Sequence, residues 1–336
     1  MRIGIDAMGT DRAPAEEVKG ALAARALLGG DDRIVLIGRE AVIREHIDKT
    51  AGWQEKIEIF HTDQVIGMDE PPVEALRAKP HSSIAVMAAM QRRRQLDACI
   101  SAGNTGACVA AAQMRLRRLP GVHRPGIAII TPTHYGPVVI CDVGANVNCR
   151  PQHLHQYGVM ASIYSSTICQ VKNPRVALLS IGQEDAKGND LVKRTRDLFK
   201  ADPSVNFIGN VEGRDLFRGV CDVVVCEGFV GNVVLKLMEG MAQGVIKALV
   251  AEVASLHPQQ LDVMKQAAAS LITKWDFNEY GGAPLLGVDG ITIICHGASD
   301  YRGIMNAVRV ARDFAALRVN EQITELLADH EGGDDA

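Results

Sequence analysis

The sequence has no apolar run that approaches the ~20 residues a membrane-spanning helix needs, and its first residues reach an acid, Asp6, too early for a signal peptide. It also has no excess of positive charge, since the formal net charge is -4 over 336 residues. Binding to a nucleic-acid backbone requires a clustered basic surface, so the composition gives no support for a nucleic-acid partner. These absences predict a cytoplasmic protein, either free or attached peripherally to a membrane.

Two nucleotide-binding fingerprints are also missing. The chain has no Gly-x-x-x-x-Gly-Lys-Ser/Thr and no Gly-x-Gly-x-x-Gly between a strand and a helix, so ATP and NAD are weak candidates and we expect no cofactor. None of the eight cysteines forms a Cys-x-x-Cys pair, which favours a reducing compartment. His153 and His155 are two residues apart on an expected helix and diverge, so we expect no metal site.

Short β-branched runs alternate with longer helical patterns. The strands are apolar throughout, which favours a mainly parallel sheet covered by helices on both faces, a three-layer α/β/α fold. We expect one domain over residues 1–330 and a disordered acidic tail at 331–336. The expected strands are Arg2–Ala7, Arg33–Ile37, Lys56–Phe60, Ala98–Ser101, Gly126–Thr131, Val138–Asp142, Arg175–Ile181, Asn206–Gly209, Asp222–Cys226 and Ile291–Cys295.

The segment Ser101–Ala107 predicts a strand, a glycine loop and a helix start. Gly103 and Gly106 allow a sharp turn, and Asn104 and Thr105 can cap the helix that follows. The free N–H groups of such a helix start, together with the positive end of its dipole, can bind a phosphate or a carboxylate. A tight turn without a ligand is the alternative.

Similar loops follow several other expected strands. Each combines glycine with amide, acidic or basic side chains, which is typical of a ligand-facing surface. Because ligands of parallel sheets bind at the carboxyl ends of strands, we expect these loops to converge on one cleft. They span Asp6–Asp11, Asp142–Asn146, Ser180–Asn189 and Glu227–Asn232.

Together these segments make the chain similar to the bacterial phosphate acyltransferase family known as PlsX. The resemblance covers almost the whole chain, and the order and number of its motifs are specific. Its motifs are Asp6–Gly9, Ser101–Ala107, Asp142–Asn146, Glu184–Asn189, Asn210–Asp215, Gly228–Val233, Glu239-Gly240, Tyr280–Ala283 and His296–Ser299. The sequence departs from the family pattern at Thr10 and Asn148, where the family usually has Gly and Asp, and at Glu227, where it usually has Asp.

The resemblance implies transfer of a long-chain fatty acyl group from acyl carrier protein to inorganic phosphate. The acyl phosphate would serve phospholipid synthesis through handover to a glycerol-3-phosphate acyltransferase. It also implies a homodimer and a fold similar to isocitrate and isopropylmalate dehydrogenases and to phosphotransacetylases. Two other interpretations stay open: a phosphotransacetylase-like enzyme that uses acyl-CoA, and a scaffold that binds acyl carrier protein and membrane without turnover.

This chemistry needs position and hydrogen-bond donors more than a strong base, because phosphate is already an oxygen nucleophile and a thiolate leaves easily. We expect Lys187 to neutralise the phosphate or the oxyanion, unless it is a surface lysine in a polar turn. We expect Asn232 to donate to the phosphate or the acyl carbonyl, unless it is a helix N-cap without a ligand.

The other candidate residues lie in the same loops. Gly103, Asn104, Thr105 and Gly106 would hold phosphate at their helix start. Asp6, Asp142 and Glu184 would orient the donors or accept from the substrate, with a purely structural role as the alternative. His296 would contact the site or be a hydrogen-bonded histidine at a strand end. Substrate-binding loops also contain Gly9, Asn146 and Gly231.

An apolar pattern with helical spacing continues on both sides of Pro258 and predicts a protruding helical hairpin over residues 241–278. It is a dimer-core helix pair, an apolar tip that rests on a membrane, or both in different parts. Arginines also cluster at 92–94 and at 115, 117 and 118. They form either solvated helix faces or a docking surface for an acidic partner protein.

Overall fold

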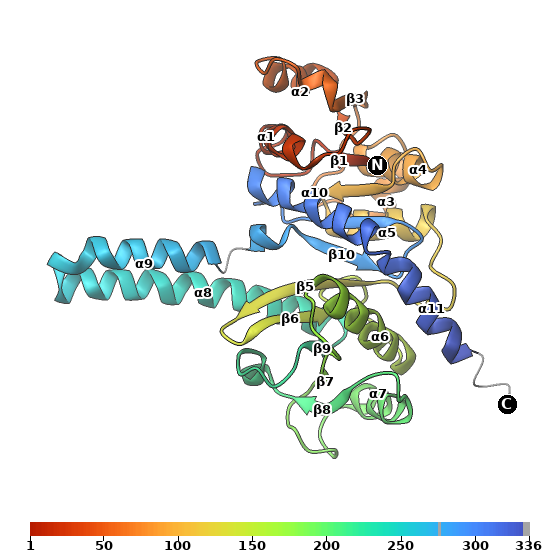
Figure 1. The fold of residues 1–336 in the computed structure, drawn as a ribbon, viewed down its shortest axis with the longest axis vertical. Coiled ribbons are helices and arrows are strands. Elements are labelled where there is room, and N and C mark those ends of the chain that lie inside the picture. Colours follow the sequence, from red (N-terminus) through yellow and green to blue (C-terminus); the bar gives the residue numbers. More distant parts are fainter. Residues whose placement is uncertain (275–276, 332–336) are drawn as a thin grey trace.

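The computed structural model describes residues 1–274 and 277–331. In this part of the chain one 11-stranded sheet runs through the molecule in the order β3-β2-β1-β4-β11-β10-β5-β6-β9-β7-β8 (Figure 1). Its strands are β1 (Arg2–Asp6), β2 (Arg33–Gly38), β3 (Ile57–His61), β4 (Ala98–Ser101), β5 (Gly126–Thr133), β6 (Gly136–Cys141), β7 (Val176–Leu179), β8 (Phe207–Val211), β9 (Val223–Val225), β10 (Ala283–Leu286) and β11 (Ile291–Ile294).

The sheet consists of two parallel halves that point in opposite directions. Strands β3, β2, β1, β4 and β11 are parallel, and so are β6, β9, β7 and β8. Between them β10 is antiparallel to β11 and to β5, and β5 is antiparallel to β6. The motif loops therefore leave the sheet at two opposite edges, because three antiparallel pairings in the middle reverse the second half.

Helices cover both faces of the sheet, which gives the expected three layers. One face carries α3 (Pro72–Ala78), α4 (Ser83–Arg92), α5 (Thr105–Arg115) and the start of α8 (Gly228–Leu256). The other carries α1 (Ala15–Ala24), α2 (Glu40–Ile47), α6 (Pro151–Ile168), α7 (Asp190–Ala201), α10 (Tyr301–Ala316) and α11 (Val319–Glu331). The apolar strands are buried because both of their faces lie under helices.

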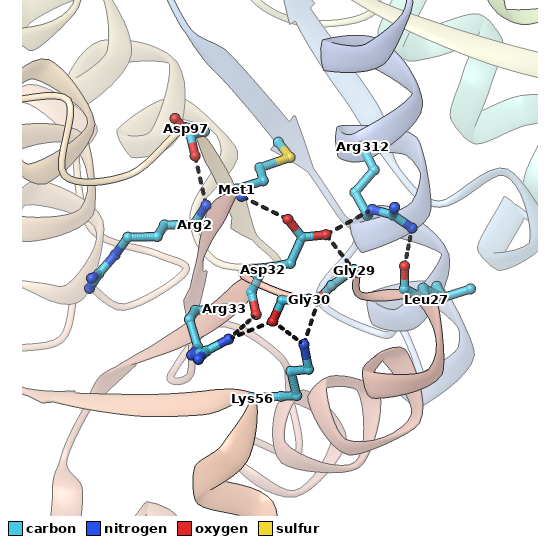
Figure 2. Close-up of polar contacts among 10 residues, drawn as sticks. All are labelled: Met1, Arg2, Leu27, Gly29, Gly30, Asp32, Arg33, Lys56, Asp97 and Arg312. Atoms are coloured by element: carbon cyan, nitrogen blue, oxygen red, sulfur yellow. Dashed lines mark hydrogen bonds and ion pairs between the residues drawn. The ribbon is translucent and has the colours of Figure 1, made fainter.

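A network of polar contacts fixes the connection between α1 and β2. The Asp32 carboxylate accepts hydrogen bonds from the N-terminal ammonium of Met1 (2.7 Å) and from the Gly29 N–H (2.8 Å). Arg312 of α10 lies 3.5 Å from the same carboxylate, and Lys56 donates to the Gly30 carbonyl (2.7 Å) (Figure 2). Positive partners hold the pKa of Asp32 below its usual value, with the N-terminal hydrogen bond as the largest cause. The contacts tie β1, β2 and α10 together at the edge of the sheet opposite the β1 loop.

The expected hairpin is present and protrudes from the body of the molecule (Figure 1). It consists of the outer part of α8, a short 3-10 turn at Pro258–Gln260, and α9 (Leu261–Lys274). Apolar side chains on it face solvent, for example Val245 at 61% and Val263 at 70% exposure. Residues 275 and 276 of the predicted hairpin, and residues 332–336 of the predicted tail, lie outside the described part of the chain. Among described helices, none is long and apolar enough to cross a membrane.

Candidate active site

The first group of predicted site residues lies at the carboxyl ends of β1, β4 and β11. We call residues 6–11, 101–106 and 295–299 the first loop group. Asp6 is buried, and its carboxylate accepts hydrogen bonds from Ser101 Oγ (2.7 Å) and the Met8 N–H (3.1 Å). Burial raises the pKa of Asp6 above its usual value, and the hydrogen bonds from serines and Met8 act against this. A Cβ at Gly9 would lie 2.7 Å from the Gly103 nitrogen, so glycine lets the loops after β1 and β4 touch.

Asn104 caps α5 as expected, but its side chain is fully engaged by the protein. Its Oδ1 accepts from the Ala107 N–H (2.9 Å). Its Nδ2 lies within hydrogen-bond distance of three carbonyls of the preceding loop, those of Gly67, Met68 and Glu70 (3.1, 3.0 and 3.0 Å). Asn104 therefore positions the α5 start and offers an anion no side-chain donor.

The backbone at the α5 start is more open. Within the described residues, the N–H groups of Thr105 and Gly106 have no protein acceptor, and the Thr105 side chain is exposed. A Cβ at Gly106 would lie 2.5 Å from Pro72 Cγ, so α3 packs directly against this turn. Two adjacent amides at a helix start are the kind of donor that an anionic oxygen accepts.

The second group lies at the carboxyl ends of the adjacent strands β6, β9 and β7. We call residues 142–146, 180–189 and 227–232 the second loop group. Asp142 is fully buried, and its carboxylate accepts from the N–H groups of Ile127, Gly144, Ala145 and Asn146 at 2.8–3.0 Å. Burial raises its pKa, while these four N–H groups favour the ionised form. Asp142 thus organises the loop after β6 from inside.

Asn146 links that loop to its surroundings. Its Nδ2 donates to the Pro125 carbonyl (2.6 Å) and the Tyr157 hydroxyl (2.8 Å), and its carbonyl accepts from the Gly228 N–H (2.8 Å). A Cβ at Gly231 would lie only 1.9 Å from the Asp142 carbonyl oxygen. Gly231 is therefore required for α8 to begin directly on this loop.

The backbone donors at the α8 start are all used. The Glu227 carboxylate accepts from Phe229 N–H (2.6 Å) and Val230 N–H (3.2 Å), and the Gly231 N–H bonds to the Glu227 carbonyl (2.9 Å). Glu227, where the family usually has Asp, thus provides the N-cap of α8. What remains available is the Asn232 side chain, which is exposed beside Gly144 and has no polar partner among described residues.

Lys187 lies in the exposed loop after β7. Within the described residues its ammonium has no acidic partner, and its stem packs over Gly182, where a Cβ would lie 2.7 Å from Lys187 Cγ. Glu184 is exposed in the same loop, and its carbonyl accepts from Lys187 N–H (3.0 Å) and Asn210 Nδ2 (3.2 Å). Two buried oxygens of this region, Ser180 Oγ and Asn210 Oδ1, have no hydrogen-bond partner in the described part of the chain. The loop therefore has a free cation and unused hydrogen-bonding capacity.

Helix α8 joins the two loop groups. Lys236 is one turn beyond Asn232 and therefore on the same helix face. Its Nζ lies 2.9 Å from His296 Nε2 in the first loop group and 2.9 Å from Glu239 Oε2. The rise from Gly228 to Lys236 is about 12 Å at 1.5 Å per residue, so the first two turns of α8 span the distance between the groups.

His296 is held at the end of β11 by its other ring nitrogen, which accepts from the Ala298 N–H (3.1 Å). None of the sequence motifs contains Lys236. Its position four residues after Asn232 was the only signal, and its contact with His296 depends on how α8 crosses the sheet.

Thr10 and Glu17 form a second feature that the sequence did not indicate. Glu17 is buried, and it accepts from the Thr10 N–H (2.6 Å) and the Thr10 hydroxyl (3.0 Å). The departure at Thr10 thus adds a hydrogen bond to a buried carboxyl. Burial raises the pKa of Glu17 to about 7. The third departure, Asn148, is exposed, and nothing in the structure explains it.

Comparisons with known proteins agree with this arrangement of motifs. The sequence model of a family described as "Fatty acid synthesis protein" matches residues 1–322. A phosphate acyltransferase of Dictyoglomus turgidum is 44% identical over 97% of this chain and 98% of its own length. One from Geotalea uraniireducens is 42% identical over 98% and 95%. The chain belongs to the phosphate acyltransferase family.

Solved structures with the same fold include phosphotransacetylases. One from Streptococcus pyogenes superposes with a TM-score of 0.61 at 15% identity, covering 94% of both chains. A branched-chain phosphotransacylase from Enterococcus faecalis gives a TM-score of 0.57 at 12% identity over 93% of this chain and 98% of that one. At these identities the likeness concerns the fold alone, which this chain shares with those two proteins.

The described residues contain no group of three or more His, Cys, Asp or Glu side chains placed to hold a metal ion. The two histidines considered above diverge on α6 as expected. His155 lies 2.8 Å from Asp202 Oδ2, and His153 Nδ1 accepts from the Arg150 N–H (3.1 Å).

Proposed function

We propose that this phosphate acyltransferase family member transfers a long-chain fatty acyl group from acyl carrier protein to inorganic phosphate. The observation that carries the proposal is full-length identity above 40% to relatives named phosphate acyltransferase. A phosphate oxygen attacks the thioester carbonyl, the carbon–sulfur bond breaks, and the carrier thiolate takes up a proton. The products are an acyl phosphate and the free carrier thiol.

The site residues support this chemistry by their position. Among the described residues, the Lys187 ammonium has no acidic partner and the Asn232 amide no polar partner. Their loops leave the neighbouring strands β7 and β9 at the same edge of the sheet. We assign them to the phosphate and to the oxyanion that forms on the carbonyl. The backbone N–H groups of Thr105 and Gly106 belong to the first loop group and have no acceptor among the described residues. They supply a further anion site.

The buried carboxylates have a different task. Asp6 and Asp142 accept hydrogen bonds from their own loops and from neighbouring strands, so they shape the loops rather than contact the substrate. Glu184 is exposed and free to orient Lys187. We assign Gly9, Gly103 and Gly231 to the close contacts that let the loops approach each other, Asn104 and Asn146 to fixing the helix starts, and His296 to contact with Lys236.

The experiment is incubation of the protein with long-chain acyl carrier protein and phosphate, followed by trapping of acyl phosphate with hydroxylamine. Carrier thiol and acyl hydroxamate are expected to form only when protein and phosphate are both present. Equal or faster turnover of short acyl-CoA would favour the phosphotransacetylase-like alternative. Binding of both acyl carrier protein and membrane with no product from either donor would favour the scaffold.

The proposal includes independence from divalent metal, because phosphate needs positioning more than activation. The same assay with a chelator is expected to give unchanged rates. Loss of activity in the chelator that zinc restores would contradict this part of the proposal.

We further propose a homodimer that is cytoplasmic and peripherally attached to membranes. The exposed apolar face of α8 and α9 supports both parts, since such a face is usually covered by a partner or by lipid. The acyl phosphate would then be released near a membrane and passed to a glycerol-3-phosphate acyltransferase.

A further inference from the structure

A basic hollow lies away from the hairpin, at the ends of two helices. It has a volume of about 770 Å³ and is bordered by the last residues of α4 and α5 and by the segment 116–125. Four arginines line it, together with Met114, whose side chain is 53% exposed. The arginines are Arg92, Arg117, Arg118 and Arg124.

Among the described residues, no acidic side chain neutralises the charge of this hollow. Arg92 donates to the Arg115 carbonyl (2.8 Å) and Arg118 to the His123 carbonyl, which occupies guanidinium hydrogens without cancelling charge. In the described part of the chain none of the four arginines has an acidic partner. Arg94, just outside the hollow, shows the contrast, because it pairs with Asp289 at 3.0 Å. This cluster of positive charge occurs in a protein whose formal net charge is -4.

A solvated helix face does not account for all of these residues. Arg92 caps the end of α5 and so has a structural task. Arg117 and Arg124 lie on the connecting segment instead, and neither side chain has a protein partner within the described residues. The same positive charge acts on His153 of the neighbouring α6. The pKa of His153 is lowered, first by burial and then by the charge of Arg124.

The hollow borders the second loop group. Its lining ends at Pro125, whose carbonyl accepts from Asn146 Nδ2 (2.6 Å), and two residues later the Ile127 N–H donates to Asp142 (3.0 Å). On the other side of that loop, Gly144 lies against Asn232. A partner bound over the arginines is therefore next to the loops assigned to the reaction.

We propose that the basic hollow is the docking surface for the acidic carrier protein that brings the acyl thioester. This rests on the proposed function. Arginines around an exposed methionine match an acidic surface with an apolar centre, because opposite charges steer and orient the partner while the apolar contact is buried. The carrier is held by Arg117 and Arg124, and its thioester arm extends past residues 142–146 to Asn232.

The test compares two double variants. The test variant is Arg117→Glu/Arg124→Glu, and the control is Lys49→Glu/Lys172→Glu. The control changes the same charge at exposed lysines that have no acidic partner among described residues and lie outside the hollow. Fluorescence anisotropy measures the Kd of labelled acyl carrier protein at low and high salt. Turnover is measured with acyl carrier protein and with a carrier-free donor, a fatty acyl thioester of pantetheine.

The arginine variant is expected to raise the Kd for the carrier by about tenfold or more at low salt, with a smaller effect at high salt. It is expected to keep wild-type turnover of the carrier-free donor, and the control is expected to change neither. An unchanged Kd, an equal loss in the control, or a parallel loss with the carrier-free donor overturns the docking proposal. If wild-type protein turns over neither donor, the proposed function fails, and the Kd comparison still decides the docking.

Discussion

At the scale of single residues, the structure separates side chains that build the site from those free to act in it. Asp6, Asn104 and Asp142 are chemically suited to bind substrate, but their side chains are already paired with groups of their own and neighbouring segments. Lys187 and Asn232 are exposed and unpaired within the described chain. The strongest expectations for catalysis therefore concern the latter two.

Lys187→Ala is expected to lower turnover by about 100-fold or more, as removal of one preorganised donor commonly does. Acyl phosphate formation trapped with hydroxylamine measures the effect, and circular dichroism checks the fold. Lys172→Ala, at another exposed lysine, serves as the control and is expected to keep wild-type rates. Unchanged kinetics in a well-folded Lys187→Ala protein would transfer the role to another donor, with Asn232 the next to test.

Glu17 is expected to make the protein less stable as pH rises. Its folded pKa of about 7 is above the model-compound value of 4.5, so the folded state holds the proton more tightly. Its stabilising contribution is complete below pH 4.5 and is lost as pH rises through 7.

Urea unfolding at pH 5.5 and pH 8 measures this dependence, because the two values lie on either side of the folded pKa of about 7. Glu17→Gln is expected to reduce the difference in unfolding free energy between the two pH values, because the group no longer titrates. Glu45→Gln, at an exposed position, is expected to preserve it. An equal pH dependence in wild type and Glu17→Gln would refute the assignment.

At the scale of elements, α8 is the segment on which the site depends. Its first turn rests on the loop after β6, its third turn reaches His296, and its outer part forms the hairpin. A shift of its first residues would move Asn232 and Lys236 together. The glycines of this helix allow a direct test, since one is enclosed and another is open.

Gly231→Ala is expected to destabilise the protein by about 1–3 kcal/mol and to lower turnover, because its Cβ would lie 1.9 Å from the Asp142 carbonyl oxygen. Gly240→Ala on the same helix, with nothing within 4 Å, is expected to be neutral or stabilising by up to about 1 kcal/mol. Urea unfolding and the hydroxylamine assay compare the two. Equal stability of both variants would contradict the close packing of α8 on the loop.

At the scale of the whole molecule, the protruding hairpin and the body have separate tasks. The body contains both loop groups and the basic hollow, whereas the hairpin exposes apolar side chains such as Leu271 and Ile272 at 46% and 52%. A surface of this kind raises the question of whether protein or lipid covers it.

Leu271→Glu or Ile272→Glu distinguishes the two. If the tip meets lipid, either change is expected to abolish sedimentation with anionic liposomes and to preserve the dimer and its activity on soluble substrate. If the hairpin is a dimer core, the dimer is expected to dissociate and sedimentation of remaining folded protein to stay unchanged. Wild-type protein that never sediments with such liposomes would exclude the membrane proposal.

The sequence by itself determined the motif loops, the start of α5 and every strand except β10. Ala98–Ser101 was predicted to the residue, and the other predicted strands differ from the structure by a few residues at their ends. These elements depend on local patterns: apolar runs, glycine turns and capping side chains within a few residues of each other. The family motifs could be recognised from the sequence for the same reason, because each is a contiguous segment.

Only the tertiary structure decided how these pieces meet. β10 was missed because Ala283–Leu286 contains a proline and no β-branched residue, and antiparallel pairing with β5 and β11 makes it a strand. That pairing reverses the second half of the sheet and separates the loops into two groups. Which polar side chains are already paired, and that Lys236 reaches His296, follow from contacts between residues far apart in sequence, which no local pattern encodes.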